Sequence, residues 1–309
     1  MNKKETRVLF MGTPEIARGC LNQLIKDEWN IIGVFTREDK PVGRKQIMTP
    51  PPVKVCAQEN NIAVYQPKTL KGESTELIKS LKPDMIVVVA YGRILPKEVI
   101  DIPKYGCINL HVSLLPKYRG AAPIQWALIN GDKCTGVTVM HIDEGLDTGD
   151  IIDVLPIDIG ENETQEELFA HVEEQGKIFL SKVCLDIIEG KAKRMPQDDT
   201  KATLAPPLTK EMAFFDFNNA ADIIHNKVRG QNPWPGAYFV YGEKKIKVIK
   251  TKLTDKNGKP GEILSTKPLI VAFSEGALEF ITVQPEGSKA MDGMAWAAGR
   301  RFTKGDMLV

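Results

Sequence analysis

The stretch RVLFMGTPEIARGCLNQLI, residues 7–25, joins a short apolar run to an amphipathic segment. Residues 7–11 are mostly aliphatic and end at Gly12, a pattern that predicts a strand stopping at that glycine. Pro14 follows where the first turn of a helix tolerates proline, and apolar side chains then recur at helical spacing. The stretch therefore predicts a strand followed directly by a helix that packs against the same sheet.

The same alternation continues through the front half of the chain. Further strand-like runs are IIGVF (31–35), MIVVVA (85–90), CINLH (107–111) and GVTVMHI (136–142). Segments with helical periodicity lie between them, around residues 53–60, 74–81 and 123–130. This alternation predicts an α/β fold with a doubly wound, mostly parallel, Rossmann-like sheet, and such sheets bind ligands beyond the carboxyl ends of their strands.

A long helix and a polar connection follow this half. Thr164 and Glu167 have the spacing of a capping box, and apolar residues at helical spacing follow them up to a terminating glycine. Residues 191–208 are polar, contain prolines and show no periodicity, which is typical of a linker between domains. We therefore predict a catalytic domain at residues 1–190 and a second domain at residues 209–309.

The tail has a different pattern. Its strand-like runs are AYFVY (237–241), KIKVIKTKL (245–253), GEILS (261–265), PLIVAF (268–273) and ALEFITV (277–283). A short helix around residues 219–229 precedes them, and strands this short indicate a small antiparallel, OB-like β-barrel. From residue 209 onward there are 15 Lys and Arg against 11 Asp and Glu, whereas the preceding residues have 26 against 29. A mildly basic tail is suggestive of contact with nucleic acid.

The composition is that of an ordinary globular protein, with 42% hydrophobic and 26% charged residues and a net charge of +1. The longest apolar run, residues 85–90, is far shorter than the roughly 20 residues that span a bilayer, and the amino-terminal residues lack a signal-peptide pattern. We therefore expect a cytoplasmic protein. Five scattered cysteines without CxxC spacing argue against a zinc site or a disulfide framework, so no metal is expected.

Two segments carry the residues most suited to chemistry. In INLHVSLLPKYRGAAPIQWALINGD, residues 108–132, Asn109 and His111 stand two apart in a strand-like run, so both side chains project to one side near its carboxyl end. A single histidine in a strand is also commonly a hydrogen-bonded structural residue, and its position alone does not decide between the two interpretations.

The second segment is HIDEGLDTGDII, residues 141–152, in which Asp143, Glu144, Asp147 and Asp150 crowd a glycine-containing loop after another strand. Such a loop is often only a solvated acidic turn, and its spacing does not fit a calcium-binding loop. The two segments together bring an amide, an imidazole and a carboxylate to strand ends of one sheet. Those are the groups that acyl transfer to an amine requires.

Two other features carry weaker signals. The turn GTPEIARG, residues 12–19, is not the GxGxxG pattern, so a dinucleotide site is disfavoured. The loop TREDKPVGRKQIMTPPPVK, residues 36–54, is long and basic; it is either a surface excursion or a place of substrate contact.

Together the two chemical segments resemble those of the folate-dependent formyltransferases. MGTPEIA, GRK, TPPPVK, ATLAPPLTKE and NPWPGA narrow the resemblance to the members that formylate initiator methionyl-tRNA, and the similarity runs almost from end to end. The resemblance implies 10-formyltetrahydrofolate as formyl donor, no metal, and a catalytic trio of Asn109, His111 and Asp147. It also implies a folate site lined by Ser113, Leu114, Leu115 and Pro116 and bordered, at the pterin pocket, by Ala90, Tyr91 and Gly92.

The resemblance further implies that transfer RNA is held by the loop at residues 36–54 and by the tail, and that the protein is a monomer. Arg44 matches the loop arginine of the family and Lys45 is kept, but Ile47 replaces a second lysine position. This departure would either lower the affinity of the loop for RNA or be compensated by the tail. Lys245 and Lys247 fall on one side of a predicted strand, where they could track phosphates or simply face solvent.

Other functions remain open at this level. A formyltransferase of the same fold that acts on a small amine, or a hydrolase of formyl-folate, would use the same three residues. A non-catalytic RNA-binding module would explain the basic tail but leave the trio without a purpose. The missing glycine fingerprint disfavours an oxidoreductase.

Overall fold

A computed structural model describes residues 2–43 and 45–308, which form two compact units. The first unit consists of Met1–Gly120, Gly136–Ile157 and Ala170–Leu204, and the second of Ala121–Thr135, Asp158–Phe169 and Ala205–Val309. The second unit therefore includes two segments of the chain that precede residue 190. The domain boundaries expected from the sequence, 1–190, 191–208 and 209–309, stay a prediction about which parts of the chain fold independently.

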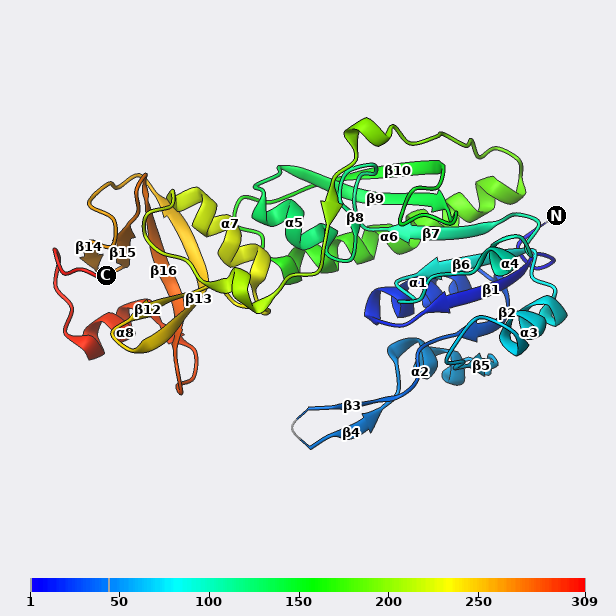
Figure 1. The fold of residues 1–309 in the computed structure, drawn as a ribbon, viewed down its shortest axis with the longest axis horizontal. Coiled ribbons are helices and arrows are strands. Elements are labelled where there is room, and N and C mark those ends of the chain that lie inside the picture. The colour runs from blue at the N-terminus through cyan, green and yellow to red at the C-terminus, as the bar shows by residue number, and fades with distance from the viewer. Residues whose placement is uncertain (1, 44, 309) are drawn as a thin grey trace. The chain divides into compact units, whose positions relative to one another are not determined.

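Within the described residues, seven strands form the sheet of the first unit, in the order β10, β9, β7, β6, β1, β2, β5 (Figure 1). The strands are β1 (Arg7–Gly12), β2 (Asn30–Phe35), β5 (Val64–Tyr65), β6 (Met85–Val89), β7 (Cys107–His111), β9 (Cys134–His141) and β10 (Ile151–Asp158). Pairing is parallel from β7 through β6 and β1 to β2 and β5. The predicted strands and the mostly parallel, Rossmann-like sheet are confirmed.

Strand β9 is the exception to this parallel order, because it pairs antiparallel to β7. His141 lies opposite Ile108, and Thr138 lies opposite His111. The loop that follows β9 therefore starts beside the amino-terminal half of β7 and not beside the carboxyl end that carries His111.

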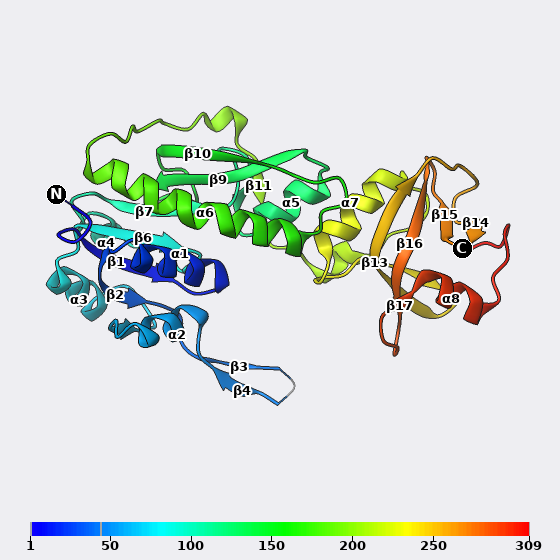
Figure 2. The ribbon, with the colours of Figure 1, turned by 180° about the vertical axis from the view of Figure 1, so that it is seen from behind.

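Helices cover both faces of this sheet, and β6 is buried at every residue for that reason. The helices of this part of the chain are α1 (Glu15–Lys26), α2 (Pro52–Glu59), α3 (Glu73–Leu81), α4 (Lys97–Ile100) and α6 (Gln165–Ile188). On one face, Leu9 and Ile86 share a core with Ile78 of α3 and Val99 of α4. Figure 2 shows α1 and α6 in front of the opposite face.

The capping box predicted before α6 is present. The Thr164 backbone N–H donates to the Glu167 carboxylate at 2.9 Å, and the Glu167 N–H donates back to the Thr164 hydroxyl at 3.4 Å. Further along the helix, Gly176 lies so close to the sheet that a Cβ there would be 3.5 Å from Leu110 and 3.3 Å from Val137. Helix α6 therefore packs closely on the face of β7 that Leu110 occupies.

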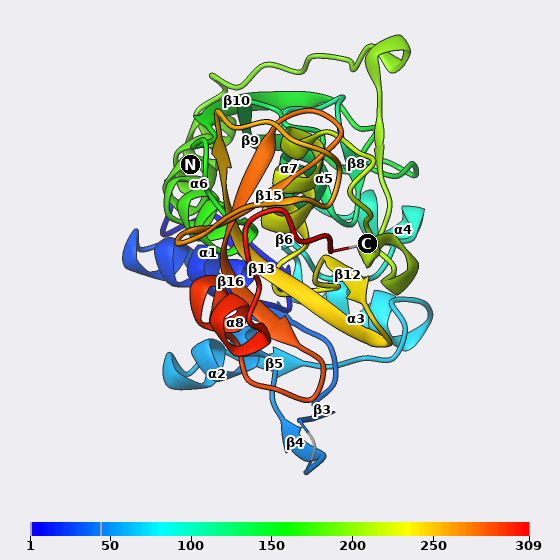
Figure 3. The same cartoon turned by 90° about the vertical axis from the view of Figure 1, so that its left-hand side faces the viewer.

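In the second unit, an antiparallel sheet has the order β12, β13, β16, β15, β14, with β17 paired to β16 (Figures 1 and 3). Its elements are α5 (Pro123–Ile129), α7 (Ala221–Gln231), β12 (Tyr238–Tyr241), β13 (Lys244–Thr254), β14 (Ile263–Thr266), β15 (Leu269–Ala272), β16 (Ala277–Pro285), β17 (Met291–Asp292) and α8 (Gly293–Arg300). The expected antiparallel β domain is confirmed. Its core is largely aromatic: Phe239 lies 5.2 Å from Phe217, 5.9 Å from Phe280 and 6.2 Å from Trp296 between ring centroids.

The segment at residues 36–54, expected as a loop, contains a short β-hairpin. Strand β3 (Lys40–Val42) pairs antiparallel with β4 (Ile47–Thr49), and every described residue of the two strands is exposed (Figure 2). The remaining short elements are β8 (Arg119–Gly120), β11 (Leu204–Ala205), η1 (Asp199–Lys201) and η2 (Lys210–Ala213). A hairpin without a buried face has no alternation of apolar and polar residues, which is why the sequence did not show it.

Four of the five free cysteines are buried, and Cys134 is exposed. Burial raises the pKa of the Cys107 and Cys184 thiols to about 12, as expected of inert core residues. Over residues 2–43 and 45–308, no helix is long and apolar enough to cross a membrane.

Truncating Phe239 should destabilise the second unit strongly. We expect Phe239→Ala to lower the free energy of unfolding by about 3–5 kcal/mol, because it leaves a cavity among the aromatic rings. The neighbouring Val240 is 44% exposed, so Val240→Ala should change it by about 0.5 kcal/mol or less. Urea denaturation followed by tryptophan fluorescence measures both, and equal effects would contradict the proposed core.

Candidate active site

Strand β7 presents Asn109 and His111 on one face, as their spacing predicted. Asn109 is paired with Val88 of β6 and with Met140 of β9, while Leu110 points to the opposite face beneath α6. Asn109 is half-buried, and among the described residues its side-chain amide makes no hydrogen bond. The amide is therefore available to donate to a ligand at the carboxyl end of β7.

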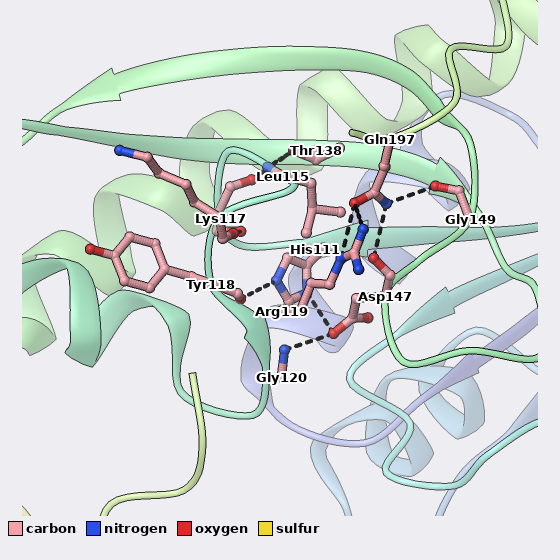
Figure 4. Close-up of polar contacts among 11 residues, drawn as sticks. His111, Leu115, Lys117, Tyr118, Arg119, Gly120, Thr138, Asp147, Gly149 and Gln197 are labelled. Carbon is pink, nitrogen blue, oxygen red and sulfur yellow. Dashed lines mark hydrogen bonds and ion pairs between the residues drawn. The ribbon is translucent and has the colours of Figure 1, made fainter. Parts of the chain in front are cut away.

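His111 is 7% exposed and has a partner at each ring nitrogen (Figure 4). Its Nε2 lies 2.9 Å from the Tyr118 carbonyl oxygen, and its Nδ1 lies 3.6 Å from Oδ2 of Asp147. A carbonyl oxygen can only accept, so Nε2 carries the hydrogen and donates it. A second proton on Nδ1 would then face the Asp147 carboxylate directly.

Asp147 reaches His111 from the loop after β9, which turns back over the sheet. Its backbone has a left-handed conformation, with φ of 54°, and its Oδ2 accepts a hydrogen bond from the Gly120 N–H at 2.9 Å. The other acidic residues of the loop have other partners or face solvent. Asp143 accepts from Thr148 at 2.7 Å, Asp150 pairs with Arg194 at 3.1 Å, and Glu144 is exposed.

The loop Ser113–Pro116 follows β7 directly and is held from inside. The buried Ser113 hydroxyl donates to the Lys117 carbonyl at 2.7 Å, and the Thr138 hydroxyl donates to the Ser113 carbonyl at 2.7 Å. Leu115 packs against Met140 and Ile151, while Leu114 and Pro116 are only half-buried. Ser113 and Leu115 therefore shape the loop, and Leu114 and Pro116 leave apolar surface accessible.

The segment Ala90–Gly92 follows the carboxyl end of β6, the parallel neighbour of β7. Ala90 and Gly92 are exposed and have left-handed backbones, with φ of 44° and 77°. The Tyr91 side chain is 1% exposed, and burial raises the pKa of its phenol. A ligand at this edge would therefore meet the backbone of Ala90 and Gly92, not the Tyr91 ring.

Two segments of the chain match one protein family. Residues 6–184, more than half of the chain, match the family described as formyl transferase, and residues 207–301 match the C-terminal domain of formyl transferases. The chain is 41% identical over 299 residues to methionyl-tRNA formyltransferase of Macrococcus caseolyticus, with 96% of each chain covered. It is 51% identical over 251 residues to methionyl-tRNA formyltransferase of Clostridioides difficile, with 81% of each covered. The chain belongs to the methionyl-tRNA formyltransferase family.

Solved structures share the fold of this formyltransferase. An N-formyltransferase from Helicobacter canadensis, in complex with folinic acid and dTDP-3-aminofucose, has a TM-score of 0.69 at 21% identity and covers 93% of this chain and 100% of its own. A 4-N formyltransferase from Francisella tularensis has a TM-score of 0.61 at 19% identity, with 77% and 93% covered. At these identities the likeness establishes the fold alone.

Sequence reasoning missed one contact of this formyltransferase, made by residues interpreted as linker. The Gln197 amide donates to the Asp147 carbonyl at 2.9 Å and to the Gly149 carbonyl at 2.8 Å (Figure 4). Gly149 itself must be glycine, because a Cβ there would lie 1.9 Å from the His141 carbonyl oxygen. A polar residue in a segment without periodicity has no sequence signal for such a contact.

The residues expected to contact RNA lie on other elements than the trio. Arg44 lies outside the described residues, and Lys45 is exposed in the turn between β3 and β4. Lys245 and Lys247 are exposed on β13 of the second unit, whereas Ile246 on the same strand is buried, as the alternation predicted.

The sequence missed two further lysines on β13. A break in the strand register on either side of Lys250 shifts the alternation, so Lys250 and Lys252 are exposed as well. The strand therefore presents a longer row of exposed lysines than residues 245–248 indicated.

Over the part of the chain that the structure describes, no group of three or more His, Cys, Asp or Glu side chains could hold a metal ion.

His141, at the end of β9, has an unusual electrostatic environment next to the Asp147 loop. Burial and, to a lesser extent, the positive charge of Arg194 lower the pKa of His141 to about 4, although Asp150 opposes both. In the unfolded chain, the pKa of a histidine is near its ordinary value of about 6.5. Between about pH 6.5 and pH 4 the unfolded chain therefore takes up a proton that the folded chain excludes, and folding loses stability as the pH falls.

Replacing His141 by a residue that does not titrate should remove this acid sensitivity. Between pH 6.5 and 4.5 we expect the melting temperature of His141→Gln to fall about 2–4 °C less than that of the unmodified protein. Differential scanning fluorimetry across this pH range measures the effect, with His171→Gln, at an exposed position of α6, as control. Identical pH profiles for His141→Gln and the unmodified protein would refute a neutral, buried His141.

Proposed function

We propose that this chain transfers the formyl group of 10-formyltetrahydrofolate to the α-amino group of initiator methionyl-tRNA. The observation that carries the proposal is 41–51% identity to methionyl-tRNA formyltransferases over most of the chain. Asn109, His111 and Asp147 at the carboxyl end of β7 supply the groups that such an acyl transfer needs. The products are N-formylmethionyl-tRNA, for the initiation of translation, and tetrahydrofolate.

In the proposed mechanism, the methionine amine attacks the formyl carbon and forms a tetrahedral intermediate with a negatively charged oxygen. The free amide of Asn109 donates a hydrogen bond to that oxygen. His111, whose Nε2–H is already donated to Tyr118, contributes the positive charge of its protonated ring beside the oxygen. Asp147 orients that ring and accepts the amine proton, directly or through water. The bond to the folate nitrogen then breaks, and that nitrogen leaves with a proton.

The folate donor is proposed to bind at the same edge of the sheet. The accessible surface of Leu114 and Pro116 would contact its apolar rings, and the exposed backbone of Ala90 and Gly92 would border the pterin. Ser113, Leu115 and Tyr91 are buried and would shape this site from behind. The bound folinic acid in the H. canadensis N-formyltransferase, which has the same fold, supports a folate-type donor.

Transfer RNA is proposed to be held through its phosphates. The candidate contacts are Lys45 in the exposed hairpin, Lys245 and Lys247 exposed on β13, and Arg44, which lies outside the described residues. Because the substrate is a transfer RNA, the reaction is proposed to occur in the cytoplasm, with the enzyme as a monomer. The alternative acceptor is a small amine, because the H. canadensis N-formyltransferase of the same fold has dTDP-3-aminofucose bound.

Removing any member of the trio should reduce turnover while sparing RNA binding. Asn109→Ala removes one donor to the oxyanion and should lower kcat by about 10²–10³. His111→Ala and Asp147→Asn should lower kcat by about 10²–10⁴. Formyl transfer from 10-formyltetrahydrofolate to initiator methionyl-tRNA measures these effects, with Glu144→Gln, an exposed acid of the same loop, as the matched control.

The same assay tests the acceptor. A strong preference for initiator over elongator methionyl-tRNA is expected, and filter binding should show unchanged affinity of the His111→Ala variant for the RNA. No transfer to either RNA by the unmodified protein, with folate still bound, would move the acceptor to a small amine or to water. Formylation by the His111→Ala variant at the rate of the unmodified protein would contradict the proposed mechanism.

The lysines of β13 should contribute to RNA affinity through charge. Lys245→Ala combined with Lys247→Ala should weaken binding and reduce the slope of log K against log salt by about one for each phosphate that these lysines neutralise. Lys267→Ala combined with Lys289→Ala removes two exposed lysines elsewhere in the second unit and should change the slope less. Equal slopes for both double variants would show that β13 is only a solvated strand.

A further inference from the structure

Gln197 joins the two loops that surround His111. Its Nε2 donates to the carbonyl oxygens of Asp147 and Gly149, at 2.9 and 2.8 Å, and so uses both of its amide hydrogens. Its Oε1 accepts from the Arg119 guanidinium, at 3.1 Å from Nε and 2.8 Å from Nη2. Every polar hydrogen and the oxygen of this amide are therefore engaged within the first unit (Figure 4).

Arg119 is itself fixed in place. It is 8% exposed, and besides Gln197 it pairs with the Asp199 carboxylate at 2.7 Å. Its backbone N–H donates to the Thr203 carbonyl at 2.8 Å, so its main chain is tied to the same segment of residues. The oxygen end of the Gln197 side chain is thus held by a buried guanidinium that has its own partners, and its nitrogen end binds the Asp147 loop.

The bonds of Gln197 lie next to the groups that the mechanism uses. Arg119 is flanked by Tyr118, whose carbonyl accepts from His111, and by Gly120, whose N–H donates to the Asp147 carboxylate. On the other side, Gln197 binds the backbone of Asp147 itself, in its left-handed conformation. One side chain therefore sets the position of the Asp147 loop relative to residues 118–120, whose Tyr118 carbonyl accepts the hydrogen bond from His111.

We propose that Gln197 is a positioning residue for formyl transfer, which holds the Asp147 carboxylate against His111 without touching substrate. The inference rests on the proposed function, since it assigns Asp147 its role there. The Asp147 loop starts beside the amino-terminal half of β7 and must be drawn back to His111. The two bonds from Gln197 fix the backbone on both sides of Thr148 and hold the loop in that place. A displacement of about 1 Å of a catalytic group can cost 10²-fold in rate.

Two substitutions separate this role from a general effect on the Arg119 site. Gln197→Met keeps the length of the side chain but loses the amide. Gln197→Glu keeps an oxygen for Arg119 but loses both hydrogens that bind Asp147 and Gly149. Gln175→Met is the matched control, because Gln175 is equally half-buried in the first unit and its amide bonds to His171 on the surface of α6.

Steady-state formylation of initiator methionyl-tRNA measures the outcome. We expect both Gln197 variants to lower kcat by about 10–100-fold, as the loss of an orienting partner does at other sites, with KM for each substrate changed less than about threefold. Gln175→Met should match the unmodified protein. Normal turnover by Gln197→Glu would show that Arg119, not the Asp147 loop, is what Gln197 serves, and a change confined to KM would also overturn the proposal.

A second readout does not depend on activity. Amide hydrogen exchange of peptides covering residues 142–150 should be faster in Gln197→Met than in the unmodified protein and unchanged in Gln175→Met. Unchanged exchange in Gln197→Met would refute the positioning role even if the acceptor proposed above is wrong. Inactivity of the unmodified protein with initiator methionyl-tRNA would instead refute the proposed function. Hydrogen exchange alone would then test whether Gln197 holds the Asp147 loop in place.

Discussion

The antiparallel pairing of β9 with β7 is the constraint on which the rest of the site depends. In a fully parallel sheet, successive strand ends would meet at one edge and bring their loops together without further help. Because β9 runs the other way, the loop after it starts away from His111 and has to return. Asp147 can face His111 only through this reversal, and the local features of the loop follow from it.

The reversal has a conformational cost that specific contacts offset. A left-handed backbone at a residue with a Cβ, as at Asp147, costs roughly 1–2 kcal/mol. Gly149 allows the chain to pass the His141 carbonyl where any side chain would collide. The Gln197 amide then provides two hydrogen bonds to the Asp147 and Gly149 carbonyls, each worth about 0.5–1.5 kcal/mol net. The Gly120 N–H provides a third, to the charged Asp147 carboxylate, worth about 1.5–3 kcal/mol. The loop is therefore held mainly by groups distant in sequence.

The difference between periodic elements and contacts made by residues distant in sequence explains what the sequence could predict. Strands and helices with one apolar face have a period, so the sheet, α6 and its capping box were visible, and period two placed Asn109 and His111 on one face. The direction of β9 was not visible, because a strand buried on both faces reads the same in either direction. The β3–β4 hairpin buries no face, and Gln197 acts on backbone carbonyls, so neither leaves a pattern in the residue types.

Nothing in the trio itself can distinguish one amine from another. In the proposed mechanism, an amide, an imidazole and a carboxylate would stabilise the transfer of a formyl group to any primary amine that reaches them, so they would set the reaction and not the acceptor. Discrimination has to come from binding energy at parts of the substrate that do not react. The exposed lysines of β13, which extend beyond Lys247 to Lys250 and Lys252, form a charged surface with no evident role in the core. The exposed hairpin carries Lys40 and Lys45 beside the apolar Val42, Ile47 and Met48. A macromolecular, negatively charged acceptor is the kind of substrate that would give such surfaces a function, whereas a small amine would leave them without one.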